Sequence, residues 1–228
     1  MIRQPHSDDQ SVPRWSLYAC SHMDFRILGP VEVLHDDRVL PLGGPKQRAV
    51  LALLIARAGS LITTDALIDG VYGEDASEGS RRSIHTYISN LRGLVGDLIQ
   101  TSGAGYQLDV DRRSVDWQRF EDDVAAADKA GDPHRTARAL RDALALWRGH
   151  AYADVDGCTS LEPEITRLEE LRMRGLEDRL DAELAGGNHG EVLAELESLA
   201  AEYPLRERFR AQHMIALYRS GRQAEALR

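Results

Sequence analysis

Between residues 80 and 96, six polar side chains recur at helical spacing in a stretch that contains no acidic residue. They are Arg81, Arg82, His85, Thr86, Ser89 and Arg92. The opposite face carries the apolar residues Ile84, Ile88, Leu91 and Val95. An α-helix fits the DNA major groove, where arginine can bond guanine at two points and hydroxyl or imidazole groups can bond bases or phosphates. The pattern is typical of a DNA-reading helix, although a solvated amphipathic helix has the same spacing.

A glycine-rich hairpin is expected directly after this helix. Two short strands, residues 98–101 and 106–110, flank a Ser-Gly-Ala-Gly turn. Gly103 can adopt the positive φ of a tight turn, and the tip of such a hairpin can reach the DNA backbone or the minor groove. We expect Tyr106 to pack against the preceding helix rather than on a base. Lys46 opens an earlier helix, where it could contact phosphate or simply face solvent.

The elements that would position these side chains form a winged helix-turn-helix over residues 24–110. At its N-terminal end, apolar and polar residues alternate in three short segments, which predicts a small antiparallel sheet. Pro45 begins a first helix that ends near Gly59. Thr63 or Thr64 supplies the N-cap of a second helix. The helix with the arginines comes third, and the hairpin after it forms the wing.

Residues 111–228 are predicted to form an all-α domain, because helices ending at glycine or proline follow one another closely. The helices on either side of Tyr203 and Pro204 fit a tetratricopeptide-like pair best. The expected fold class is therefore mainly α: a winged helix-turn-helix with small antiparallel sheets, followed by a tetratricopeptide-like helical domain. We interpret residues 1–23 as a disordered leader because they lack periodicity. The chain ends at Arg228 within a helix, which suggests truncation.

No pattern of residues indicates catalysis, a metal or a cofactor. The sequence lacks a phosphate-binding P-loop, a nucleophile elbow and a zinc-binding His-Glu-x-x-His motif. Neither of the two cysteines has metal-ligand spacing around it. No apolar run is long enough to cross a bilayer, and no secretory signal begins the chain. We therefore predict a non-enzymatic, cytoplasmic protein with no cofactor, no metal site and no membrane partner.

The charge of the chain argues against strong non-specific binding to nucleic acid. The formal net charge is −9, and residues 24–110 contain eight basic and eleven acidic residues. Phosphate attraction needs positive charge at the contact surface rather than over the whole chain, and the basic residues of the third helix meet this need locally. The balance predicts modest affinity for arbitrary DNA.

Four motifs in order along the chain resemble those of the SARP family of actinobacterial antibiotic-pathway regulators. They are Leu-Gly-Pro at residues 28–30, Gly-Pro-Lys-Gln-Arg and the apolar run after it at 44–54, Ser-Ile-His-Thr-Tyr-Ile-Ser-Asn-Leu-Arg at 83–92, and Gly-Tyr at 105–106. Members of that family join an OmpR-like winged helix to a bacterial transcriptional activation domain built of tetratricopeptide-like helices. They often carry arginine where His85 stands, so this chain departs from the pattern at that position.

This resemblance implies sequence-specific binding to direct repeats in double-stranded promoter DNA, with the third helix in the major groove, and recruitment of RNA polymerase. Our leading hypothesis is a non-catalytic transcriptional activator of a biosynthetic gene cluster, bound to repeated half-sites as a homodimer. The alternative is a non-catalytic protein-interaction adaptor that uses the helical repeats. The arginine pair at residues 81 and 82 favours the activator, whereas the acidic balance of residues 24–110 favours the adaptor.

Overall fold

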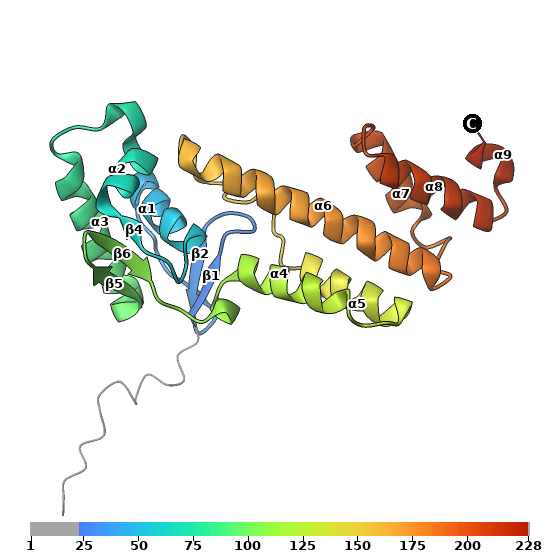
Figure 1. The fold of residues 1–228 in the computed structure, drawn as a ribbon, viewed down its shortest axis with the longest axis horizontal. Coiled ribbons are helices and arrows are strands. Elements are labelled where there is room, and N and C mark those ends of the chain that lie inside the picture. The colour runs from blue at the N-terminus through green and yellow to red at the C-terminus, as the bar shows by residue number, and fades with distance from the viewer. Residues whose placement is uncertain (1–22, 228) are drawn as a thin grey trace, which may run out of the picture.

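The computed structural model describes residues 23–227. The leader predicted for residues 1–23 therefore lies outside the described residues, except for Met23. That residue opens the first strand, where it is paired with His35. Figure 1 shows an elongated molecule with the winged domain at one end and a row of helices extending from it.

The N-terminal sheet has three antiparallel strands in the order β1-β2-β3. The strands are β1 (Met23–Arg26), β2 (Glu32–His35) and β3 (Arg38–Val39). The turn between β2 and β3 contains Asp36 and Asp37, with φ of 48° and 63°. Two consecutive residues with positive φ suit the twist of a two-residue hairpin, and short aspartate side chains tolerate that region of φ.

Three helices follow the sheet, and their limits agree with the sequence signals. They are α1 (Pro45–Ala56), α2 (Thr64–Tyr72) and α3 (Ser80–Val95). The Thr63 hydroxyl caps α2 by accepting a hydrogen bond of 3.1 Å from the Ala66 amide. The apolar stripe of α3, which includes Ile84 and Ile88, is buried against α1 and α2. This packing leaves the polar face of α3 toward solvent.

The wing is a second three-stranded antiparallel sheet, in the order β4-β6-β5. Its strands are β4 (Ile62–Thr63), β5 (Ile99–Ser102) and β6 (Gly105–Leu108). Strand β4, which precedes α2, brings the hairpin against the helices. Gly105 allows this pairing, because a Cβ atom there would lie 2.1 Å from the Ile62 carbonyl oxygen.

The rest of the described chain is helical. The helices are α4 (Asp116–Ala127), α5 (Pro133–Leu144), α6 (Glu162–Ala185), α7 (Leu193–Glu202), α8 (Glu207–Arg219) and α9 (Gln223–Ala226). Short 3₁₀ turns are η2 (Gly73–Asp75), η3 (Gly96–Leu98), η4 (Arg112–Ser114) and η5 (Thr159–Leu161). The α4–α5 hairpin runs along α6, and α7, α8 and α9 lie toward the far end of the molecule (Figure 1). The predicted fold class is confirmed.

A single hydrophobic core continues from the winged domain into the helical domain. It includes Phe25 of β1, Leu54 of α1, Phe120 of α4 and Leu168 of α6, none more than 1% exposed. A second core holds the other half of α6 against α7 and α8 around Leu180 and Phe209. The long helix α6 therefore connects both cores, and the winged domain is packed directly on the first helical pair.

Asp116, at the start of α4, links the two domains through the backbone of β1 and the residues after it. Its carboxylate accepts hydrogen bonds from the Ile27 amide at 2.9 and 3.0 Å and from the Leu28 amide at 2.9 Å. The Leu28 carbonyl in turn accepts a 2.7 Å hydrogen bond from the Arg148 amide. Gly29 has φ of +151°, and a Cβ atom there would lie 2.9 Å from Cβ of Arg148. Glycine therefore permits this close contact.

We expect the free energy of unfolding to depend on pH through Asp116. Burial raises the pKa of its carboxyl from 3.8 to about 6, against the lowering effect of the amide hydrogen bonds and Arg148. The folded state then binds the proton more tightly than the unfolded state, so the stability from this group is full below pH 4 and is lost as the pH rises through about 6. A shift of this size corresponds to about 3 kcal/mol.

The measurement is urea unfolding of the wild-type chain and of Asp116→Asn between pH 4.5 and 7.5. Because asparagine cannot titrate, the wild-type stability should fall relative to the variant as the pH increases. A constant difference between the two proteins across this range would contradict the raised pKa.

Candidate nucleic-acid interface

Helix α3 presents an open polar surface at the edge of the winged domain. Arg82, Thr86 and Ser89 are all exposed and lie along this surface. Within residues 23–227, the guanidinium of Arg82 makes no hydrogen bond or ion pair. The Thr86 hydroxyl donates to the Arg82 carbonyl at 3.0 Å, which leaves the Thr86 oxygen free to accept from a ligand. These three side chains face solvent and are available for contact with a ligand.

Arg81 lies on the same surface but pairs with a carboxylate. Its guanidinium forms an ion pair with Asp65 in the first turn of α2, and the two side chains are 54% and 80% exposed. Solvent screening makes such a pair weak, so an approaching phosphate can compete with Asp65 for Arg81. Sequence reasoning did not identify this partner, because residues 65 and 81 belong to different helices.

His85 and Arg92 point to the wing rather than away from the protein. Both contact Tyr106 of β6, which is 5% exposed. The His85 Nδ1 atom lies 2.6 Å from the Tyr106 hydroxyl, and the Arg92 guanidinium carbon lies 5.7 Å from the centre of the Tyr106 ring. The expectation that Tyr106 packs against the third helix is confirmed.

Arg92 also binds the neighbouring wing strand directly. Its Nε atom donates to the Ile99 carbonyl at 2.8 Å, and Nη2 donates to the Thr101 hydroxyl at 2.7 Å. Arg92 is half-buried. Its hydrogen bonds to Ile99 and Thr101 join α3 to β5. Its geometry is that of a residue that sets the position of the wing relative to α3.

We expect Tyr106→Phe to weaken promoter binding by a few-fold while changing stability by about 1 kcal/mol or less, since one side-chain hydrogen bond is lost. The ring and its contact with Arg92 remain, but His85 loses its partner and can reorient. Fluorescence anisotropy with promoter DNA measures the first effect and thermal unfolding the second. An unchanged affinity would show that the hydroxyl does not help position His85 or the wing.

The remaining two predicted residues lie on opposite flanks of α3. Gly103 is at the exposed tip of the wing with φ of +54°, the conformation predicted for it. Lys46, at the start of α1, lies 3.9 Å from the centre of the Tyr72 ring and is exposed. A hydrogen bond of 2.9 Å from Asn90 to Gln47 places the same end of α1 beside the middle of α3. The wing tip and Lys46 therefore flank the exposed face of α3.

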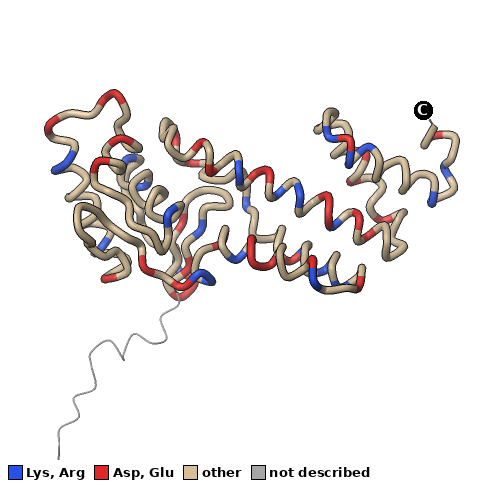
Figure 2. Tube along the Cα trace, in the orientation of Figure 1, with Lys and Arg blue, Asp and Glu red and all other residues tan. Residues whose placement is uncertain are grey.

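The charge around this surface is mixed. Figure 2 shows acidic positions in the segment leading into α3 and basic positions at the start of the helix. Glu74, Asp75 and Glu78 are exposed in that segment. Their negative charge opposes the attraction of any polyanion to this surface.

Each half of the chain matches a known protein family. Residues 40–108 match the family described as "Transcriptional regulatory protein, C terminal", and residues 115–228 match the "Bacterial transcriptional activator domain". The regulatory protein DnrI of Streptomyces peucetius is 34% identical over 220 residues, covering 90% of this chain and 81% of DnrI. The chain belongs to the SARP family of transcriptional regulators.

Other SARP-related proteins are longer than this chain. The regulatory protein AfsR of Streptomyces griseus is 39% identical over 99% of this chain, which spans only 23% of AfsR. A solved structure of Mycobacterium tuberculosis EmbR in complex with a low-affinity phosphopeptide superposes with a TM-score of 0.86 at 37% identity. That superposition covers 91% of this chain and 57% of EmbR. The arrangement of winged domain and helical domain described above is therefore shared with a solved relative.

Residues 23–227 contain no group of three or more histidine, cysteine, aspartate or glutamate side chains that could hold a metal ion. None of their helices is both long enough and apolar enough to cross a membrane. The names of the related proteins are those of transcriptional regulators rather than enzymes.

Proposed function

We propose that this protein activates transcription by binding double-stranded promoter DNA with α3 in the major groove. The observation that carries the proposal is the exposed face of α3. Within residues 23–227 the Arg82 guanidinium and the Ser89 hydroxyl have no hydrogen-bond partner, and the Thr86 oxygen can still accept a hydrogen bond. Arginine bonds guanine at two points, and hydroxyl groups bond bases or phosphates. In this proposal the wing tip at Gly103 and the amine of Lys46 contact the DNA backbone on either side of α3.

The test is an anisotropy titration of the full chain against promoter DNA from its own gene neighbourhood, beside scrambled DNA, at two salt concentrations. Tighter binding to the native promoter, with an affinity that falls as salt increases, supports the proposal. Equal and weak binding to both DNAs would contradict sequence-specific recognition. It would favour the protein-interaction adaptor, which the acidic residues beside α3 make the second candidate.

We further propose that two protomers bind direct repeats as a homodimer and recruit RNA polymerase. On direct repeats the protomers must face the same side of the duplex, so affinity should depend on helical phase. Inserting about 5 base pairs, roughly half a helical turn, between the repeats should abolish cooperative binding, whereas a full turn should restore part of it. Reconstituted transcription with purified RNA polymerase then tests recruitment. Unchanged transcript levels would contradict the activator role.

A further inference from the structure

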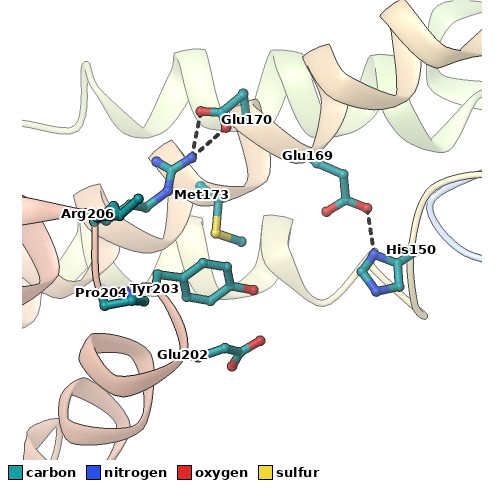
Figure 3. A pocket seen from close by; sticks show the side chains of 9 residues that line it. His150, Glu169, Glu170, Met173, Glu202, Tyr203, Pro204 and Arg206 are labelled. Atoms are coloured by element: carbon teal, nitrogen blue, oxygen red, sulfur yellow. Dashed lines mark hydrogen bonds and ion pairs between the residues drawn. The ribbon is translucent and has the colours of Figure 1, made fainter.

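A pocket of about 510 Å³ lies in the helical domain, far from α3, where the turn between α7 and α8 faces α6 (Figure 3). Its apolar lining consists of Met173, Tyr203, Pro204 and Leu205. Its polar lining consists of His150, Glu169, Glu170, Glu202 and Arg206. DNA binding as proposed above uses none of these residues.

Three carboxylates line the pocket, and they differ in whether a positively charged side chain lies beside them. Glu170 accepts two hydrogen bonds of 2.6 Å from Arg206. Glu169 accepts one of 3.0 Å from the Ala151 amide, forms an ion pair of 3.6 Å with Arg172 and lies 3.4 Å from His150. Within the described residues, Glu202 has no cationic partner. Of the three carboxylates, that of Glu202 is therefore the one left to attract a cation.

The floor of the pocket is apolar and fixed in position. Met173 is 7% exposed, and the Tyr203 ring lies 6.0 Å from the ring of Phe209, centre to centre. Leu205, beside them, is 94% exposed. Figure 3 shows the Tyr203 ring and the Met173 thioether directed into a gap that has Glu169 on one side and Glu202 on the other. An apolar side chain can enter this gap with a positive group beside Glu202.

We propose that this pocket docks a cationic, amphipathic segment of a partner protein, with a leucine-like side chain on Met173 and Tyr203 and an arginine or lysine against Glu202. The carboxylate of Glu202 beside the apolar floor suits a peptide that carries both kinds of side chain. Leu205 adds apolar surface at the rim, where a bound segment would shield it from water. The site would give the helical domain a protein contact that is independent of the DNA contacts of α3.

Methionine methyl resonances provide a direct test in the full chain. Met173 lies in the pocket, whereas Met23 of β1 and Met214 of α8 lie outside it. The probe is a short helical peptide with leucine and arginine on one face, titrated into protein labelled with ¹³C at the methionine methyl groups. Matched peptides replace arginine by glutamate or leucine by serine. We expect the cationic amphipathic peptide alone to shift Met173 while Met23 and Met214 stay unchanged.

Two variants identify the contact, and one serves as the control. Glu202→Gln should weaken the peptide about two- to fivefold, the range of a partly exposed ion pair, and Leu205→Ser should weaken it further. Glu191→Gln makes the same charge change on an exposed residue before α7 and should have no effect.

The proposal is overturned if Met173 does not shift, if the acidic or serine peptide shifts it equally, or if Glu191→Gln weakens binding as much as Glu202→Gln. Promoter DNA affinity should be the same in all three variants.

Discussion

Arg82→Ala is expected to weaken promoter binding about tenfold or more and to leave the thermal midpoint unchanged. Arg82 is exposed on α3 and makes no ion pair within the described chain, so its removal breaks no contact that stabilises the fold. Alanine also has the highest helix propensity, so the helix itself is preserved. A lost bidentate contact to guanine costs about 1 to 3 kcal/mol of binding free energy, and each 1.4 kcal/mol is roughly tenfold in affinity.

The matched control is Arg38→Ala. Arg38 is an exposed arginine on β3, in the other sheet of the winged domain, so the variant carries the same change in net charge. A similar loss of affinity in both variants would assign the effect to long-range charge rather than to contact with a base. An intact affinity in Arg82→Ala would exclude Arg82 from recognition. A large fall in its thermal midpoint would instead make it a structural residue.

Asp116→Ala is expected to lower the free energy of unfolding by about 2 to 4 kcal/mol. The variant leaves the amides of Ile27 and Leu28 buried without an acceptor, and an unsatisfied buried donor costs about 1 to 3 kcal/mol. The variant no longer has to bury a carboxylate, and this gain offsets part of the penalty. For a chain of this size, the thermal midpoint should fall by roughly 5 to 15 °C.

Asp123→Ala provides the comparison, because Asp123 is an exposed carboxylate on the same helix. Thermal unfolding followed by circular dichroism measures both variants. We expect the midpoint of Asp123→Ala to stay within a degree or two of the wild type, since surface substitutions of this kind change stability by about 0.5 kcal/mol or less. Equal midpoints for the two variants would mean that Asp116 does not hold the winged domain on α4.

The contacts of Asp116 also help to fix the orientation of the winged domain on the helical domain. The amides that Asp116 accepts from belong to the segment just after β1, and the first core runs from that segment into α4. Arg48 of α1 adds a second link through an ion pair of 2.5 Å with Asp154, which also accepts from the Val31 amide at 2.7 Å. A partner bound to the helical domain would therefore be held in a set orientation relative to α3.

Local pattern was sufficient to predict most elements of this protein. The spacing of Ile84, Ile88 and Leu91 predicted α3 because a helix repeats every 3.6 residues and one side must be buried. A threonine at position 63 or 64 marked the start of α2 because its hydroxyl can satisfy a free amide, and the structure assigns the cap to Thr63. Gly103 marked the wing tip because glycine tolerates positive φ. Each of these signals acts over a few residues, so sequence alone carries it.

What the sequence could not determine is the role of side chains whose partners are distant along the chain. Arg82 and Arg92 are alike in the sequence, but the fold leaves Arg82 open and bonds Arg92 to β5. In the sequence Asp116 looks like any carboxylate at the start of a helix. The structure shows that it accepts hydrogen bonds from the amides of residues 27 and 28. A hydrogen bond between residues nearly ninety positions apart has no periodic signature, because it depends on how finished elements pack. Sequence therefore determined the helices, the wing and the family, and only the tertiary structure decided which polar side chains of α3 bond other elements and which face solvent.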